Sequence, residues 1–449
     1  MSVPALSDAL RSAKERYAAR NPSSLAQWRV ASRAMPGGNT RTILFFDPFP
    51  LCMVRGEGCY LFDADGHRYV DLLGEYTAGI FGHSNPVIRA AINDALNDGL
   101  SLSAHNPAEI RLANLIRDRY VSMELVRFTN SGTEANLMAI ATAIAFTGRR
   151  RILVFAGAYH GSVLKFGDTG SPINVPHDFL IAPYNDIETT RSLLREHAGA
   201  LAGVLVEPML GSGGCVPGDP PFLQMLADEC RASGAMLIFD EIQTSRLSAG
   251  GRQALLGLRP DLTTLGKYHG GGLSFGAFGG RADVMSLYDP RTAQHLSHAG
   301  TFNNNVLSMA AGYAGLSAVA TAEALDGLNR RGDLLREELG RLFAATGCGL
   351  RVSGLGSLLT LHAGAGPAST AEAGALVFFD LLERGFYAAP RGLIALSLAI
   401  EDSHLGAFLA AMRDIVAQRA ALFQPRALQS DEAAERCCGS LARSSGQRP

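Results

Sequence analysis

An aspartate and a lysine are the two side chains of this sequence that are best suited to chemistry. Asp240 follows Ala235–Phe239, an uninterrupted apolar run that predicts a strand buried on both faces of a parallel sheet. Ligands of open α/β sheets bind beyond the carboxyl ends of the strands, so this carboxylate is expected to point toward a ligand. Lys267 precedes Gly270–Gly272, where glycines allow a close-packed backbone. A carboxylate at a strand end and a single lysine form a pair that catalysis can use.

The pair has two interpretations. In the first, Lys267 forms a Schiff base with pyridoxal phosphate, and Asp240 keeps the pyridine nitrogen protonated because a nearby anion favours the charged form. The lysine attacks an aldehyde only when it is neutral, and burial beside a cationic ring favours that state. In the second, Asp240 caps the following loop and Lys267 lies at the surface. These two residues alone leave both interpretations open.

A phosphate site is predicted where the strand Leu125–Thr129 passes into a helix. The first turn of a helix has unpaired N–H groups and the positive end of the helix dipole, which together bind phosphate. We therefore expect Ser131, Gly132 and Thr133 to hold a phosphate group. A plain capping box between Ser131 and Glu134 explains the same residues equally well.

Two further strands end in polar residues at the same predicted edge. Ile152–Phe155 is followed by Tyr159 and His160, and Val204–Val206 is followed by Glu207. Tyr159 is placed to stack on a flat ring, with His160 beside it, although an edge-covering aromatic and a core histidine fit as well. Glu207 either lines the same site or holds a loop by accepting backbone N–H bonds.

Composition narrows the class of protein. The 449 residues are 47% hydrophobic and 18% charged with a net charge of −2, which argues against nucleic acid or an acidic membrane as partner. Seven cysteines without a C-x-x-C pair indicate free thiols and neither a metal site nor a redox motif. Residues 1–20 have no apolar segment of the signal-peptide type, and no apolar run approaches the roughly 20 residues that span a bilayer. We expect a cytoplasmic location.

The fold class follows from strands that alternate with helices over residues 125–280, a pattern typical of an α/β protein with a mainly parallel sheet. The chain is too long for a single core. The expected parts are an N-terminal arm that packs with the small domain, a large cofactor-binding domain, a smaller C-terminal α+β domain and a disordered tail, over residues 1–60, 61–310, 311–425 and 426–449.

Four motifs in this order resemble those of the class III aminotransferases, which are fold type I pyridoxal phosphate enzymes with a seven-stranded-type sheet in the large domain. They are Asn130–Ala135, Tyr159–Gly161, Phe239–Glu241 and Thr264–Lys267. The resemblance covers residues 35–420 and points to the branch that contains glutamate-1-semialdehyde aminomutase. Within that branch, four more segments are most similar to the β-phenylalanine aminotransferases: Asn39–Arg41, Glu75–Gly79, Asp240–Arg246 and Gly300–Asn305.

The resemblance implies roles for the cofactor residues. Lys267 is the Schiff-base lysine, Asp240 pairs with the pyridine nitrogen, and residues 131–133 hold the phosphate. Tyr159 stacks on the ring, and Thr301 reaches the phosphate of the neighbouring subunit, which implies a homodimer with active sites at the interface. The other cofactor-binding residues that we expect are His160, Glu207 and Gln243. Gln243 departs from the branch, which usually has a methionine there, so reactivity or substrate preference is expected to differ.

The resemblance also implies that Arg41 and Arg391 receive substrate carboxylates, and Tyr76 completes the expected substrate site. Two guanidinium forks at different distances from the cofactor would let two different acids bring their reacting carbons to one lysine. For each arginine the alternative is a structural ion pair.

These observations predict a transaminase. It would move the amino group of a β-amino acid, most simply an aromatic one, to 2-oxoglutarate or pyruvate. The alternative is an aminomutase of the glutamate-1-semialdehyde kind, which needs no second acid. A cofactor-binding regulator without catalysis is the third possibility, and the presence of both Asp240 and Lys267 disfavours it.

Overall fold

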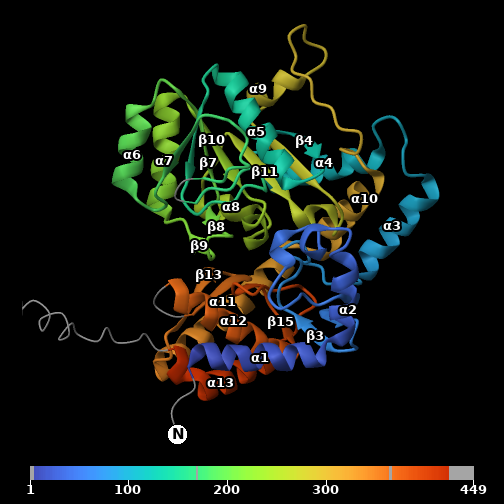
Figure 1. Ribbon diagram of the computed structural model, residues 1–449. Coiled ribbons are helices and arrows are strands. Elements are labelled where there is room, and N and C mark those ends of the chain that lie inside the picture. The colour runs from blue at the N-terminus through green and yellow to red at the C-terminus, as the bar shows by residue number, and fades with distance from the viewer. Residues whose placement is uncertain (1–4, 168–169, 364–366, 424–449) are drawn as a thin grey trace, which may run out of the picture.

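The computed structural model describes residues 5–167, 170–363 and 367–423, and the tail expected over 426–449 lies outside them. These residues form two units, a larger one built on a seven-stranded sheet and a smaller one that contains the first and the last described helices (Figure 1). No helix in this part of the chain combines the length and the apolar character that crossing a bilayer requires.

One mainly parallel sheet organises the large unit. Its strands are β4 (Leu125–Thr129), β5 (Arg151–Phe155), β6 (Phe179–Ala182), β7 (Leu201–Val206), β10 (Met236–Asp240), β11 (Leu262–Gly266) and β12 (Gly276–Gly280). They lie in the order β4-β12-β11-β10-β7-β5-β6, and β12 runs antiparallel to both of its neighbours while the other pairs are parallel. The predicted α/β fold with a mainly parallel seven-stranded sheet is confirmed.

Helices cover both faces of this sheet because successive strand residues point to opposite sides. Val204 and Val206 of β7 belong to the core under α7 (Pro220–Ser233), whereas Leu205 between them belongs to the core under α5 (Gly132–Thr147). The other helices of the unit are α3 (Pro86–Asp98), α4 (Pro107–Arg119), α6 (Ile187–Glu196), α8 (Gly251–Leu256), α9 (Ala282–Met285) and α10 (Val306–Ala314). Short elements between them are β8 (Met209–Leu210), β9 (Val216–Pro217), η3 (Thr244–Leu247), η4 (Lys267–Gly270) and the π-helical η6 (Gly315–Val319).

Strand β12 is not predicted by the sequence, because three of its five residues are glycine and glycine has low strand propensity. The structure shows what the glycines do. A Cβ atom on Gly276 would lie 2.2 Å from the carbonyl oxygen of Ser131, and one on Gly280 would lie 2.1 Å from that of Asp261. The missing side chain of Gly276 therefore lets β12 approach the turn between β4 and α5, where a phosphate site is expected, and that of Gly280 lets it approach the residue before β11.

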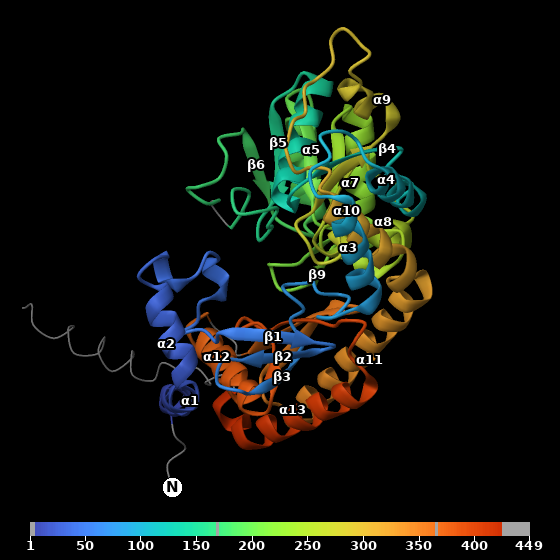
Figure 2. The ribbon, with the colours of Figure 1, turned by 90° about the vertical axis from the view of Figure 1, so that its right-hand side faces the viewer.

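The small unit holds two further sheets. One contains β1 (Met53–Glu57), β2 (Tyr60–Asp63), β3 (Arg68–Asp71) and β15 (Phe386–Tyr387), and the other β13 (Leu350–Leu355), β14 (Leu358–Ala363) and β16 (Leu393–Ala395). Its helices are α1 (Leu6–Arg20), α2 (Pro22–Ala31), α11 (Ala322–Thr346), α12 (Pro367–Glu383) and α13 (Asp402–Phe423), and α11 and α13 lie side by side below the first sheet (Figure 2). The expected boundary between residues 60 and 61 falls inside β2, and β3 of the expected large domain pairs in parallel with β15 of the expected C-terminal domain.

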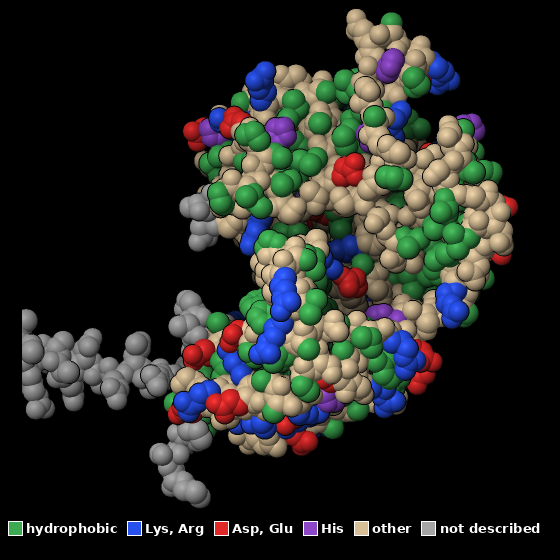
Figure 3. Space-filling model, turned by 45° about the vertical axis from the view of Figure 1, so that its right-hand side comes forward, with side chains coloured by type: hydrophobic (Ala, Val, Ile, Leu, Met, Phe, Trp, Pro, Cys, Tyr) green, Lys and Arg blue, Asp and Glu red, His purple; other side chains and the backbone are tan. Residues whose placement is uncertain are grey.

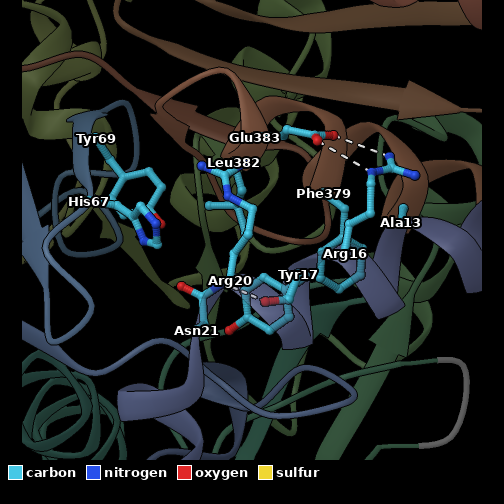
Figure 4. A pocket seen from close by; sticks show the side chains of 10 residues that line it. All are labelled: Ala13, Arg16, Tyr17, Arg20, Asn21, His67, Tyr69, Phe379, Leu382 and Glu383. Carbon is cyan, nitrogen blue, oxygen red and sulfur yellow. Dashed lines mark hydrogen bonds and ion pairs between the residues drawn. The ribbon is translucent and has the colours of Figure 1, made fainter.

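The N-terminal helix α1 packs on α12 of the small unit. Both guanidinium nitrogens Nε and Nη2 of Arg16 donate to Glu383, at 3.3 and 3.1 Å (Figure 4). One residue along, the ring of Tyr17 lies 5.2 Å from that of Phe379. The first and the last parts of the described chain thus share one core.

Candidate active site

The strand ends of the large sheet bring most of the predicted cofactor residues to one edge. Strands β4, β5, β7, β10 and β11 are parallel to one another, so their carboxyl ends meet there. Asp240 ends β10, and Lys267 directly follows β11. This face of the molecule is hollowed between the two units, with basic and acidic side chains at the hollow (Figure 3).

The backbone of Lys267 has a conformation that few residues other than glycine adopt. Its φ of 55° lies in the left-handed region, and η4 starts at this residue. The next turn is fixed by His269, whose ring nitrogens lie 2.9 Å from the carbonyl oxygen of Gly266 and 2.9 Å from the hydroxyl of Tyr120. The position of the lysine is therefore set by buried hydrogen bonds behind it.

Protein atoms surround the amine of Lys267, although the residue as a whole is partly exposed. This desolvation lowers the pKa of the amine to about 8. The carboxylates of Asp240 and Glu207 act in the opposite direction, and the guanidinium of Arg391 adds to the lowering. A sizeable neutral fraction of the amine near physiological pH follows from this balance.

Asp240 is 4% exposed and receives three donors. Its Oδ2 lies 2.8 Å from Nδ1 of His160 and 2.8 Å from Nδ2 of Asn136, and its Oδ1 accepts from the N–H of Ile242 at 3.0 Å. Hydrogen bonds of this number and length suit an ionised carboxylate. The alternative in which Asp240 caps the following loop is also present, in the bond to Ile242.

Asn136 is a residue of the site that the sequence analysis does not identify. It lies on α5 with no exposed surface, and its Oδ1 accepts from the hydroxyl of Thr264 at 2.7 Å. This bond fixes which end of the amide faces Asp240. The signal in the sequence is a single amide in segment 135–146, whose other residues are apolar except for Thr142, and a pattern of this kind does not by itself indicate the partner of the amide.

Both interpretations of residues 131–133 have support in the structure. Ser131 caps the helix, since its Oγ accepts from the N–H of Glu134 at 3.2 Å, but the Glu134 side chain accepts from the N–H of Asn130 at 2.7 Å, one residue before the position that a complete capping box uses. The N–H groups of Gly132 and Thr133 lie in the first turn of α5, where a helix offers no acceptor of its own. The cap therefore leaves the donors for a phosphate in place.

Glu207 holds a loop, as one of its two interpretations states. It is buried, and it accepts from the N–H of Tyr159 at 2.9 Å and from that of Gly211 at 3.0 Å. Burial raises the pKa of this carboxyl to about 7. Tyr159 is 40% exposed. The side chain of Gln243 packs against Gly211, where a Cβ atom would lie 2.0 Å from Oε1 of the glutamine.

The predicted substrate residues meet at Tyr76. The guanidinium carbons of Arg41 and Arg391 lie 5.3 and 5.9 Å from the centre of the Tyr76 ring. Arg391 also donates to Ser212 at 2.8 Å, and Arg41 forms an ion pair with Glu75. The arginine of the N-terminal arm and the arginine before β16 are thus brought to one ring.

Thr301 lies in an exposed turn. Its loop is anchored next to the phosphate-site residues of the same chain, because Asn130 donates to Asn303 at 2.9 Å and Asn106 donates to the carbonyl of Asn304 at 3.1 Å. These contacts hold the loop in place and leave the side chain of Thr301 at the surface.

The family model described as Aminotransferase class-III matches residues 46–416. The chain belongs to the class III aminotransferases, and it is a pyridoxal phosphate-dependent aminotransferase of fold type I.

Two relatives and two solved structures illustrate the similarity. The chain is 51% identical to the β-phenylalanine transaminase of Variovorax paradoxus, over 95% of this chain and 100% of the relative. The crystal structure of the β-phenylalanine aminotransferase from Variovorax paradoxus has a TM-score of 0.91 and 50% identity, with 94% of this chain and 99% of that chain covered. A transaminase solved with bound pyridoxal phosphate has a TM-score of 0.84 and 33% identity, with 90% and 99% covered. Glutamate-1-semialdehyde 2,1-aminomutase of Sorangium cellulosum is 37% identical over 90% of this chain and 99% of the relative.

The residues at this edge of the sheet fit the cofactor of the family. An amine of lowered pKa suits an aldehyde, a buried carboxylate suits a pyridinium, and free N–H groups at a helix start suit a phosphate. Nε2 of His160 is buried and has no partner among the residues that the structure describes. Lys267, Asp240 and the first turn of α5 would hold pyridoxal phosphate, which when bound supplies an electron sink for a bond broken at the amino carbon of the substrate.

We expect the nucleophilicity of Lys267 in cofactor-free protein to rise with pH around a midpoint of about 8, because only the neutral amine reacts. The apoprotein is mixed briefly with pyridoxal phosphate at a series of pH values and reduced with borohydride. Mass spectrometry then measures the pyridoxyl group on the Lys267 peptide, and a Lys267→Ala variant gives the background from other lysines. A midpoint at the ordinary value of 10.5 would contradict the desolvation of this amine.

We expect Asn136→Ala to reduce kcat/KM by about tenfold or more, because Asp240 loses one donor in a site with little water. The matched control is Thr142→Ala, which removes another fully buried hydrogen-bonding side chain of α5, one that bonds to Met138 and Tyr288. Both variants should lose roughly 1–3 kcal/mol of stability in urea unfolding. Equal losses of activity in the two variants would show that Asn136 has no specific effect on Asp240.

Proposed function

We propose that the chain transfers the amino group of an aromatic β-amino acid, such as β-phenylalanine, to 2-oxoglutarate or pyruvate. The observation that carries this proposal is that two guanidinium groups, those of Arg41 and Arg391, both lie close to the ring of Tyr76. In a β-amino acid one carbon separates the carboxylate from the reacting carbon that bears nitrogen. In an α-keto acid the carboxylate is bonded directly to the reacting keto carbon. Two carboxylate-binding groups at one site let both acids present their reacting carbons to the same lysine. The similarity to the Variovorax paradoxus enzyme supports the same substrate class.

In this proposal each residue has a stated task. Nζ of Lys267 takes the proton from the carbon that bears the amino group and returns a proton in the reverse half-reaction, and a pKa of about 8 suits both directions. Asp240, held by Asn136 and His160, supplies the fixed negative charge that keeps the cofactor ring protonated. Gly132 and Thr133 bind the phosphate through their N–H groups.

We also propose a homodimer in which Thr301 reaches the cofactor phosphate of the neighbouring subunit. The exposed turn that carries it is anchored by Asn303 and Asn304 and also presents Phe302, which is 61% exposed. An apolar ring of this size at the surface suits an interface with a second copy. A cytoplasmic location suits the free thiols of the described cysteines.

With β-phenylalanine alone, the holoenzyme is expected to complete one half-reaction and stop, and addition of 2-oxoglutarate or pyruvate should restore continuous turnover. The absorbance of the cofactor reports the first result, and formation of the β-keto acid reports the second. α-Phenylalanine is the matched control, since it differs only in the position of the amino group. Turnover of an amino acid without any acceptor would instead identify an aminomutase.

Mixing of two inactive variants tests the shared site. Lys267→Ala subunits keep Thr301 and Thr301→Arg subunits keep Lys267, so a mixed dimer contains one complete site if Thr301 acts across the interface. Activity should return on mixing, and light scattering should give twice the 47.5 kDa of one chain. No recovery in a proven mixed dimer would show that Thr301 serves its own chain or no site.

A further inference from the structure

The arginine that is proposed to receive a substrate carboxylate already holds a carboxylate of its own chain. The guanidinium of Arg41 is paired with Glu75, and the two side chains are 44% and 59% exposed. An ion pair with this much exposure is weak, with a free energy of about 0–1 kcal/mol. Glu75 can therefore be displaced by another carboxylate.

The backbone that carries Glu75 is unusual. The φ angles of Gly74, Glu75, Tyr76 and Thr77 are 52°, 47°, 52° and 81°, so four consecutive residues lie in the left-handed region. For residues with a side chain this region is unfavourable by about 1–3 kcal/mol each, and it persists only where the surrounding structure holds it. Such strain is typical of sites where side-chain placement matters.

Asp71 at the end of β3 holds this segment. Its Oδ1 accepts from the N–H groups of Leu73 and Gly74, both at 2.9 Å, and its Oδ2 lies 2.8 Å from Nε2 of His83. The segment closes with a bond from the N–H of Gly79 to the carbonyl of Gly74 at 2.7 Å. Glu75 and Tyr76 are thus presented by a rigid turn and not by a loose loop.

The surroundings of Glu75 set the charge of the substrate site. Both arginines lie close to the ring of Tyr76, and its hydroxyl donates to the carbonyl of Ile43 at 3.0 Å, near Arg41 in the sequence of the arm. One acid and two guanidinium groups leave a net charge of about +1 around this ring, where the arginines alone would leave about +2. A cavity of about 420 Å³ adjoins Glu75 and Tyr76 and is also lined by Trp28, Asn39 and Leu44, so the carboxylate has space to turn away.

We propose that Glu75 is a specificity-determining residue that competes with the substrate for Arg41. A substrate carboxylate takes the guanidinium as Glu75 turns into the adjoining cavity. Glu75 thereby weakens the binding of every acid that uses Arg41, and most of all of a dicarboxylate that reaches both Arg41 and Arg391. This inference rests on the proposed role of Arg41 as a carboxylate-binding residue.

The test measures binding to the holoenzyme with two acids that carry no amino group, glutarate and 3-phenylpropanoate. Glu75→Gln keeps the length of the side chain and removes the charge. By isothermal titration calorimetry its Kd for glutarate should be about three- to fivefold lower than that of the wild type, with a smaller decrease for 3-phenylpropanoate. The matched control is Glu57→Gln, which breaks a comparably exposed pair with Arg55 and should leave both Kd values unchanged.

A double-mutant cycle shows whether Glu75 competes with the substrate for Arg41 or instead orients Arg41 for the substrate. In an Arg41→Ala background, Glu75→Gln should change either Kd much less than in the wild type, because Glu75 then has no guanidinium to compete for and only the water-screened effect of its charge remains. Weaker binding in the single Glu75→Gln variant would mean that Glu75 orients Arg41 for the substrate, and unchanged binding would mean that it does neither; both results overturn the proposal. An Arg41→Ala variant that binds both acids like the wild type would overturn it together with the role of Arg41. Because neither acid can be transaminated, failure of β-phenylalanine as a substrate would count against the proposed function alone.

Discussion

The arrangement of the site depends on the amine of Lys267, which is buried away from water and interacts electrostatically with two nearby carboxylates. Burial favours the neutral amine and lowers its pKa, whereas Asp240 and Glu207 favour the ammonium and raise it. The pKa of about 8 is the result of these opposing effects. This balance requires that the ends of several strands come together at one edge. It also requires that each carboxylate has its own donors, which His160, Asn136 and backbone N–H groups provide.

Much of this arrangement can be predicted from the sequence, because its signals are local. An apolar run that ends in Asp240 indicates a buried strand with a carboxylate at its carboxyl end. Ser131 with Glu134 three residues later indicates the start of a helix. Strand β12 escapes prediction because its glycines serve a close approach of backbones, which has no periodic signature. Asn136 is not identified from the sequence, because the role of a buried amide follows only from its hydrogen-bond partners, here Thr264 and Asp240.

The pair of Arg41 and Glu75 lies beyond prediction for a different reason. Left-handed backbone is indicated in a sequence by glycine or asparagine, and three residues of the turn at 74–77 are neither. Asp71 holds only the start of the turn through local hydrogen bonds, and the contact that forms the pair joins Glu75 to Arg41, 34 residues away, so it cannot be read from the turn itself. The cofactor residues come from the large unit, whereas the arginines and Tyr76 come from the arm and the small unit. The residues proposed for the chemistry and those proposed for substrate binding therefore lie in different parts of the chain.

The parallel pairing of β3 with β15 has a consequence for how the protein is made. Val70 and Asp71 find their partners, Phe386 and Tyr387, only when nearly the whole polypeptide has left the ribosome. Until then β3 lacks this partner, while all strands of the central sheet lie within residues 125–280 and can pair before that point. We therefore expect the small unit, with the turn that carries Tyr76, to be completed after the central sheet.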